Sequence, residues 1–340
     1  MKARVFGAGS IGNHLTHALI KRGFSVEVVD IDKSSLLRMR DEIYPLRYGT
    51  WDDSIKLLLE PTQNLVDLEV IGTPPDIHSK ILLEGINLNR SKAWLVEKPF
   101  TYPDLDHIND LKNKLVGFEE RIFVGYNHSV TPPFITFLKA ISKKNNVTRI
   151  YCNWLEHWGG IFKAHPWLKG PEDSYLGFYK RGGGSLMEHS HGLHILLLVI
   201  NNLGLKINNT SSSVKKDQNG NYDEYVNIVF NLEGSFGDLI ATYTTDVLTK
   251  DTSKKIVVET EDEIFSVEFG GYNGSSDIFR HVCKNNELKT IYKKNRPDDF
   301  KYEISLLGDM LEGGNSRLIG NLSCKWGIEI SSLCSTILNH

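Results

Sequence analysis

The chain has 340 residues, of which 40% are hydrophobic and 24% charged, with a formal net charge of −3. This length suggests two domains, and a near-neutral charge without a long basic block argues against a nucleic-acid-binding protein. No apolar run approaches the roughly 18 residues of a membrane-spanning helix, and the N-terminus is too charged for a secretory signal. Cys152, Cys283, Cys324 and Cys334 form no C-x-x-C pair, so neither a zinc knuckle nor a disulfide scaffold is expected. We therefore expect a cytoplasmic protein.

A glycine-rich loop follows the first predicted strand. Residues 7–12 (Gly-Ala-Gly-Ser-Ile-Gly) fit G-x-G-x-x-G, residues 11–22 have helical spacing, and a second strand at 25–29 ends at Asp30. A strand before the glycines, a helix behind them and an acidic residue 23 positions beyond the first glycine are typical of a dinucleotide-binding fold. The glycines permit the tight turn, the close approach of a pyrophosphate to the backbone, and helix–strand packing.

Asp30 is expected to select the cofactor. Its carboxylate accepts hydrogen bonds from the adenosine ribose hydroxyls and repels a 2′-phosphate, which favours NAD over NADP. Lys33 and Ser34 follow closely and could instead cradle that phosphate, so NADP stays an alternative.

Alternation of strands and helices continues through the first half. Further strands are predicted at 68–71, 93–96 and 122–124, and the helix between the first two is expected to be capped by Asp76. Such alternation predicts a doubly wound parallel sheet with right-handed crossovers. Ligands bind outside the carboxyl ends of these strands. Because Thr73, Lys98 and Asn127 follow those ends, we expect one crevice to hold them.

The second half is organised around three glycines at 182–184. They precede Glu188, three histidines at 189, 191 and 194, and an apolar run at 195–200. This order predicts a tight loop that leads into one buried helix. A spacing of three residues places Glu188 and His191 on one helical face, whereas His189 points away.

The remainder is predicted to form an open, mostly antiparallel sheet. Strands are expected at 148–154, 225–232, 238–243, 256–259 and 264–269, with polar loops at 208–223 and 249–255 and helices at 300–311 and 328–338. The second face of this sheet requires cover from the helix behind the glycines or from a partner chain.

With these residues assembled, the chain resembles the Gfo/Idh/MocA family of oxidoreductases (glucose–fructose oxidoreductase, inositol dehydrogenase, rhizopine catabolism). The matching motifs are the glycine loop 7–12, Gly72-Thr73-Pro74-Pro75 with His78, Glu97-Lys98-Pro99, and the triple glycine with Glu188 and His191. The resemblance covers nearly the whole chain. It implies an N-terminal Rossmann domain, 1–128, and a C-terminal α/β domain, 129–340, for substrate binding and oligomerisation, with the C-terminal helix packing back on the first domain.

The resemblance also implies site roles. Lys98, His191 and Glu188 are the predicted catalytic residues, with Lys98 near the nicotinamide and His191 as general acid/base. The predicted cofactor-binding residues are Gly7, Gly9, Ser10, Ile11, Gly12, Asp30, Thr73, Pro74, His78, Glu97, Lys98 and Asn127. The predicted substrate-binding residues are Lys98, Tyr126, His128, Trp158, Trp167, Tyr175, Tyr179 and His191, and His165 joins this aromatic pocket. Relatives often carry an aspartate where this chain has His194, and an arginine where it has Ser129.

We therefore expect an NAD(P)-dependent dehydrogenase or reductase that acts on a sugar, cyclitol or nucleotide sugar, as a homodimer or homotetramer without nucleic-acid partners. An imidazole that titrates near neutral pH suits removal of the alcohol proton, and an ammonium group stabilises the resulting negative oxygen. The alternatives are an NAD-retaining hydrolase or epimerase and a nucleotide-sensing regulator.

Each site residue also has a simpler interpretation. His191 could be a buried structural histidine, Lys98 a solvated lysine, and the aromatic residues packing groups. The three histidines with Glu188 could form a metal site, but they lack a fourth soft ligand, and no metal is predicted.

Overall fold

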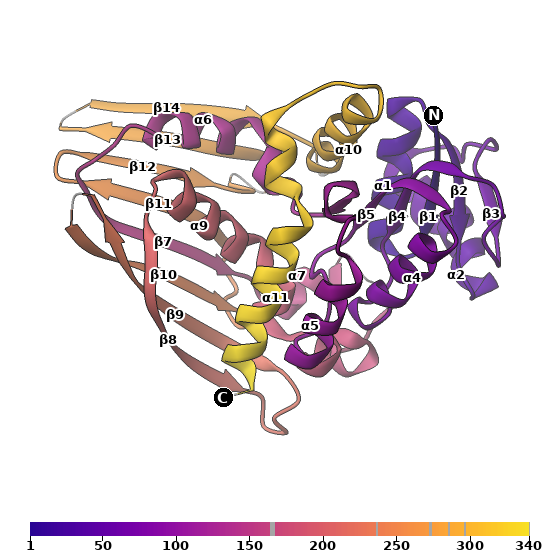
Figure 1. The fold of residues 1–340 in the computed structure, drawn as a ribbon, viewed down its shortest axis with the longest axis horizontal. Helices are drawn as coiled ribbons and strands as arrows, with labels where there is room; N and C mark the ends of the chain where they lie inside the picture. The colour runs from indigo at the N-terminus through magenta and orange to yellow at the C-terminus, as the bar shows by residue number, and fades with distance from the viewer. Residues whose placement is uncertain (164–166, 236, 272–273, 285, 296, 340) are drawn as a thin grey trace. The chain divides into compact units, whose positions relative to one another are not determined.

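The computed structural model of the chain describes residues 1–163, 167–235, 237–271, 274–284, 286–295 and 297–339 (Figure 1). The chain divides into two units. Met1–Asn127 and Pro297–Ser332 form the first, and His128–Arg296 and Leu333–His340 form the second. His165, predicted to line a pocket, lies outside the described residues. No helix among the described residues has the length and apolar character needed to cross a bilayer.

A parallel sheet of six strands forms the centre of the first unit. Its strand order is β3-β2-β1-β4-β5-β6, and every pairing is parallel. The strands are β1 (Lys2–Phe6), β2 (Ser25–Val29), β3 (Lys56–Leu58), β4 (Val66–Ile71), β5 (Ser91–Val96) and β6 (Ile122–Val124). This order matches that of a doubly wound dinucleotide-binding sheet, so the predicted fold of the first half is confirmed.

Helices join these strands, and the chain returns to the unit after the second one. The helices are α1 (Ser10–Arg22), α2 (Lys33–Arg38), the π-helix η1 (Met39–Ile43), α3 (Tyr44–Tyr48), α4 (Pro75–Asn87), α5 (Leu105–Lys114), η2 (Glu119–Arg121), α10 (Asp298–Leu311), η7 (Arg317–Leu322) and the first part of α11 (Cys324–Leu338), whose last residues belong to the second unit. Asp76 was predicted to cap α4, but the N-cap is Pro74 and Asp76 lies in the first turn. Pro75 starts this helix because its missing N–H would have no partner there.

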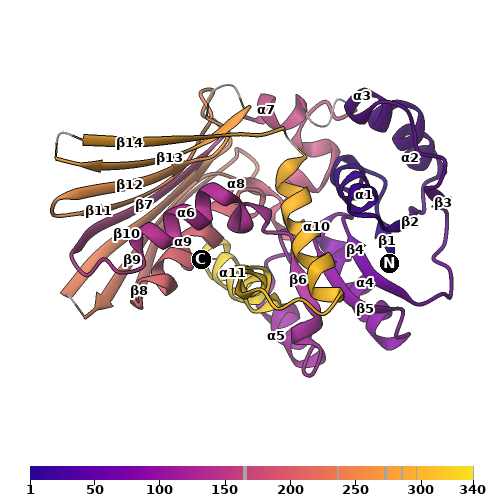
Figure 2. The ribbon, with the colours of Figure 1, turned by 90° about the horizontal axis from the view of Figure 1, so that it is seen from above.

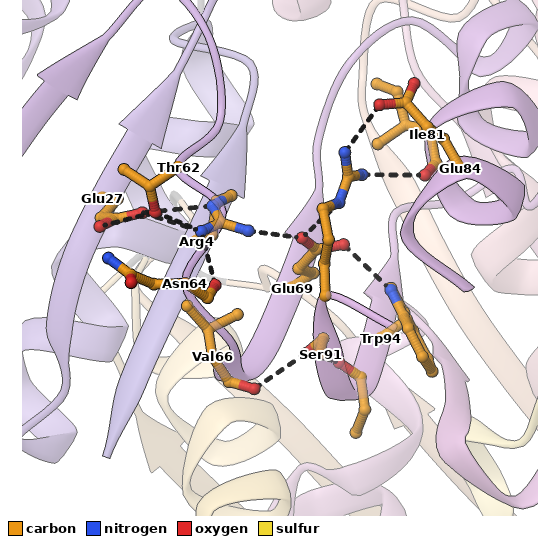
Figure 3. Close-up of polar contacts among 12 residues, drawn as sticks. Arg4, Glu27, Thr62, Asn64, Val66, Glu69, Ile81, Glu84, Ser91 and Trp94 are labelled. Carbon is orange, nitrogen blue, oxygen red and sulfur yellow. Dashed lines mark hydrogen bonds and ion pairs between the residues drawn. The ribbon is translucent and has the colours of Figure 1, made fainter. Parts of the chain in front are cut away.

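A buried ion network crosses one face of the parallel sheet (Figure 3). Arg4 on β1 lies opposite Glu27 on β2 and Glu69 on β4. Arg4 donates to both carboxylates, at 3.2 Å and 2.9 Å, and Arg90 pairs with Glu69 at 3.2 Å. Trp94 on β5 donates to the second oxygen of Glu69 at 3.0 Å. Arg4, Arg90 and Trp94 thus all contact the carboxylate of Glu69, which is fully buried.

The second unit contains a sheet of eight strands, ordered β14-β13-β12-β11-β7-β10-β9-β8. The strands are β7 (Val147–Leu155), β8 (Lys206–Lys216), β9 (Asp223–Gly234), β10 (Gly237–Asp246), β11 (Ser253–Thr260), β12 (Glu263–Glu268), β13 (Ser276–Cys283) and β14 (Asn286–Lys293). All pairings are antiparallel except that of β7 with β10. The predicted mostly antiparallel sheet is therefore confirmed, and β11 and β12 pair as neighbours within it.

Helices cover one face of this sheet, as Figures 1 and 2 show for α6 and α9. The helices of the unit are η3 (Asn127–Val130), α6 (Pro132–Ile141), α7 (Trp158–Lys163), η4 (Pro171–Asp173), η5 (Tyr175–Gly177), η6 (Tyr179–Arg181), α8 (Gly184–Glu188) and α9 (Ser190–Asn202). The apolar run of α9 is buried.

Four strands differ from the sequence prediction. The segment 208–223 was predicted as a polar loop, but most of it belongs to β8, an exposed edge strand. Strand β8 has no apolar alternation because neither of its faces is buried. It is a strand because its backbone pairs with β9. The predicted loop 249–255 is shorter than expected, because β11 begins at Ser253. Strands β13 and β14 were not predicted. Most of β14 is exposed, as β8 is, and so has no apolar alternation.

Candidate functional site

The glycine loop of the first unit has the shape of a dinucleotide cradle. Gly7 has a φ of +100°, and a Cβ at Gly12 would lie 1.9 Å from the carbonyl oxygen of Gly7. By contrast, a Cβ at Gly9 would meet no atom within 4 Å. Open space therefore lies over the middle glycine, next to the positive end of α1, where backbone N–H groups bind phosphates.

Asp30 lies at the end of β2, beside this loop. Its two carboxylate oxygens accept the backbone N–H groups of Ala8, at 2.8 Å, and Asp32, at 2.9 Å. An ionised carboxylate offers about four lone-pair sites, so Asp30 keeps acceptor capacity for a ribose. Hydrogen bonds from Ser34 lower the pKa of Asp32 to about 2. The Asp32 carboxylate is thus a second negative charge, and it lies beside Ser34, the residue that was the alternative ligand for a 2′-phosphate. It further disfavours binding of that phosphate.

Two features of this cradle were not predicted. Ile31 directly follows Asp30 and is 94% exposed, an unusual position for an isoleucine, and its apolar surface suits an adenine ring. Arg47 on α3 donates to the carbonyl oxygen and the hydroxyl of Ser10, at 3.1 Å and 3.0 Å. A guanidinium in the first turn of α1 opposes the helix dipole, and an anion bound at that turn compensates it. No local pattern marks Arg47, because α3 brings it to the loop from 37 residues away.

The motifs behind β4 and β5 are joined through His78. Its two ring nitrogens lie 2.7 Å from the carbonyl oxygen of Thr73 and 3.0 Å from that of Pro99. Burial lowers the pKa of His78, although its contacts with the two carbonyl oxygens act to raise it. The peptide bond between Lys98 and Pro99 is cis. His78, predicted to bind cofactor, thus fixes the Thr73 turn relative to Lys98.

Lys98 itself is half-buried beside a group of carboxyl groups. The backbone N–H of Lys98 lies 3.3 Å from an oxygen of Glu97. Burial, together with Glu97 and Asp299, raises the pKa of Glu303 well above its usual value. Glu303 on α10 is fully buried near Glu97 of the Glu-Lys-Pro motif.

Two polar atoms at the carboxyl edge of this sheet have no protein partner. The hydroxyl of Thr73 and the amide oxygen of Asn127 are buried without a hydrogen bond within the described part of the chain. Buried polar groups are ordinarily paired. These two atoms, the cradle and Asp30 together fit a nicotinamide dinucleotide along this edge.

In the second unit, Asp223 holds the triple-glycine loop. One carboxylate oxygen of Asp223 accepts the hydroxyl of Ser185, at 2.6 Å, and the N–H of Leu186, at 2.7 Å. Gly184 has a φ of +86°, and a Cβ there would lie 2.0 Å from the other oxygen of Asp223. Burial raises the pKa of Asp223 to about 6. Sequence reasoning missed this residue, because its partners lie 37 and 38 positions away.

The histidine segment is two helices rather than the single predicted one. Helix α8 ends at Glu188 and α9 begins at Ser190, with His189 between them. The hydroxyl of Tyr243 donates to the carbonyl oxygen of His189 at 2.6 Å, and the ring of His189 lies 2.9 Å from the hydroxyl of Thr245. These contacts divide the helix, so Glu188 and His191 do not share one continuous helical face.

His191 lies in a cluster of aromatic rings. The centroid of its ring is 4.8 Å from that of His128 and 6.2 Å from that of Trp154. His128 further contacts Trp154 at 5.3 Å and Phe269 at 5.1 Å. His194, one turn beyond His191, is fully buried. The structure therefore brings together two predicted residues, His128 and His191.

The other predicted substrate residues have different surroundings. Trp158 and Tyr175 are partly buried and pack against the apolar cluster of Ile161, Leu176 and Val247. The ring of Tyr179 lies under the ammonium of Lys216 on β8, at 4.5 Å. Trp167 is half-buried. Tyr126, in the first unit, is fully buried.

Among the residues that the structure describes, no group of three or more His, Cys, Asp or Glu residues could hold a metal ion. His189 instead lies 3.8 Å from Glu156, which pairs with Lys254 at 2.8 Å.

No protein-family model matches this sequence, and no curated protein matches it. Solved structures match it over nearly their whole length. The UDP-N-acetylglucosamine 3-dehydrogenase from Acidithiobacillus ferrooxidans has 14% identity and a TM-score of 0.71, with 99% of this chain and 96% of that chain covered. A 3-ketoreductase from Actinomadura kijaniata in complex with NADP has 11% identity and a TM-score of 0.72, with 99% and 96% covered. An inositol dehydrogenase homolog from Azotobacter vinelandii complexed with NAD+ has 12% identity and a TM-score of 0.72, with 100% and 94% covered. The chain therefore shares the α/β fold of these oxidoreductases from end to end.

Proposed function

We propose that this protein is an NAD-dependent dehydrogenase or reductase that moves a hydride between the nicotinamide and a secondary alcohol or ketone carbon of a sugar, cyclitol or nucleotide sugar. The observation that carries the proposal is the dinucleotide cradle at the carboxyl edge of the parallel sheet, with Thr73 and Asn127 offering unpaired polar atoms. The similar structures support it, since they are dehydrogenases and a ketoreductase, two of them described with NADP or NAD+.

The residues have distinct roles in this proposal. The nicotinamide, when bound, supplies the hydride acceptor or donor. His191 takes the hydroxyl proton during oxidation and returns it during reduction. The ammonium of Lys98 stabilises the negative charge that develops on the substrate oxygen. Glu188 orients the substrate, and the first unit binds the cofactor while the second, 129–340 in the predicted division, binds the substrate.

Asp30 and Asp32 support NAD over NADP. Asp30 follows β2, where an acidic residue meets the adenosine ribose in this type of sheet, and Ser34, the alternative phosphate ligand, donates its hydroxyl hydrogen bond to Asp32. Comparison of turnover with the two cofactors tests this preference, and a higher kcat/KM with NADP would contradict it.

The test of the whole proposal is turnover with NAD on a panel of cyclitols, sugars and UDP- or TDP-linked sugars, followed by NADH absorbance. On the best substrate, Lys98→Ala and His191→Ala are expected to lose about 100-fold or more in kcat/KM, the usual range for proton-transfer groups. Lys92→Ala is the matched control, because Lys92 lies on β5, the strand that leads to Lys98, and its exposed side chain pairs with Asp67. If both variants stayed folded and kept turnover within about threefold of wild type, the proposed chemistry would be wrong. Cofactor retained through purification without net NADH formation would instead favour an NAD-retaining hydrolase or epimerase.

We also propose a cytoplasmic homodimer or homotetramer that associates through the eight-stranded sheet. Ile240 and Ile264 are exposed, while the residues that flank them along their strands, Leu239, Ala241 and Phe265, are buried. The sheet face opposite α9 therefore carries apolar side chains that a second copy would cover. Light scattering that gave the monomer mass would contradict this association. The four cysteines are free thiols, which supports a reducing compartment.

A further inference from the structure

We propose that His128 is a positioning residue for His191, and that the two imidazoles act as one coupled pair in which the charge of either ring is felt by the other. This inference rests on the proposed function only for the catalytic role of His191. The pair itself is a feature of the second unit and is testable without cofactor or substrate.

The first support is the geometry of the two rings. Their centroids are 4.8 Å apart and their planes meet at 82°, so the edge of one imidazole faces the ring of the other. Aromatic pairs prefer this arrangement at 4.5–7 Å. In such a contact, rotation of either ring about its χ2 angle would change the contact of the other.

The second support is the environment that fixes His128. Its ring contacts Trp154 on β7 and Phe269 behind β12, at interplanar angles of 65° and 62°. Its carbonyl oxygen accepts the hydroxyl of Thr131 at 2.8 Å, where α6 begins. The rings of Trp154, Phe269 and His191, together with this backbone hydrogen bond, thus determine where His128 lies.

The third support is the close approach of α9 to the sheet. A Cβ at Gly192 would lie 2.7 Å from Trp154 and 2.8 Å from Tyr243, so only glycine lets the helix come this near. The thiol of Cys152 donates to the carbonyl oxygen of Gly192 at 3.4 Å. The residue before Gly192 is His191, and this approach brings its ring against Trp154 and His128.

Other titratable groups lie on the neighbouring elements. Glu188 ends α8 three residues before His191, and His194 lies one turn after His191 on α9. His189 lies 3.8 Å from Glu156, and Lys254 on β11 pairs with Glu156 and lies 6.0 Å from the centre of the Trp154 ring. All of these groups stay in place when either ring of the pair is replaced. A change in the pKa of the remaining imidazole therefore reports the loss of the other ring.

The experiment is histidine-labelled NMR of the protein without ligands, in wild type and in His128→Phe and His191→Phe. Each variant lacks one ring signal and reports the apparent pKa of the remaining ring alone. The coupling between the rings is the sum of the two pKa values from the variants minus the sum of the two pKa values in wild type. Two charges this close at the effective dielectric of a protein give a coupling of about one to three pH units.

The controls and outcomes separate this inference from the proposed function. His281→Phe is the matched control, since His281 is also stacked on an aromatic ring, Phe265, within the same unit, and it is expected to shift neither signal. His128→Gln replaces His128→Phe if the latter is unfolded. A coupling below about 0.3 pH unit overturns the inference, because like charges in contact must oppose each other. In turnover assays, His128→Phe is expected to shift the pH profile of kcat/KM that His191 controls. A failure of the proposed function would abolish turnover in wild type and leave the NMR coupling intact.

Discussion

The buried carboxyl group of Asp223 predicts how the stability of the second unit depends on pH. Its pKa rises from 3.8 to about 6 on folding. The native state therefore holds a proton that the unfolded chain has released, so stability is greatest below the unfolded pKa and is lost as pH rises through 6. Between pH 5 and pH 7, this single group lowers the free energy of unfolding by about 1.3 kcal/mol.

Asp223→Asn is the variant that isolates this effect. The amide oxygen can accept both hydrogen bonds that one oxygen of Asp223 accepts, from Ser185 and Leu186. The NH2 group takes the place of the other oxygen, which has no partner among the described residues. The variant is therefore expected to fold, without the pH-dependent loss.

Calorimetry at pH 5 and pH 7 measures the difference. At about 2–4 °C per kcal/mol for a domain of this size, the melting temperature of wild type should fall by about 3–5 °C relative to that of the variant. Because other titrating groups are common to both proteins, their contributions cancel. If the two proteins kept the same difference in melting temperature at both pH values, the reasoning about this carboxyl group would be refuted.

Two further predictions concern the first unit. Glu69→Gln should lower the free energy of unfolding of this unit by about 3–5 kcal/mol, because Arg4 and Arg90 lose a buried partner. Glu84→Gln, at the exposed end of the same network, is the control and should lower it by less than about 1 kcal/mol. Equal losses of stability in the two variants, measured by calorimetry, would contradict this prediction. Arg47→Ala should weaken NADH binding about tenfold, or by about 1.4 kcal/mol, in a fluorescence titration, because the variant lacks the cation that we expect near the cofactor phosphates. The control is Arg40→Ala, since the side chain of Arg40 pairs with Asp41. Unchanged NADH binding in Arg47→Ala would exclude a contact between Arg47 and the phosphates.

The features that the sequence predicts well are those with a local cause. The glycine loop, Asp30 and the apolar strands of the first unit each follow from spacing or composition within a short window. Strand β8 and most of β14 have no such cause, because exposed strands carry no apolar alternation.

The features that the sequence does not predict depend on partners far along the chain. Asp223 meets the triple-glycine loop only when β9 is paired in the sheet. Arg47 reaches Ser10 only after α3 packs beside α1. The break at His189 follows from hydrogen bonds to Tyr243 and Thr245. In each case, the local sequence is compatible with a simpler structure, and tertiary contacts decide against it.

The return of α10 to the first unit has a consequence for synthesis. Phe300 stacks on His14 with ring centroids 5.1 Å apart, and Arg22 pairs with Asp309 and Glu312, so α1 packs against a helix encoded almost three hundred residues later. On the ribosome, the sheet strands of the second unit emerge before the first unit has its last helices. The first unit therefore completes its packing only near the end of translation, and a fragment that ends at Asn127 would expose the surface of α1 that α10 covers.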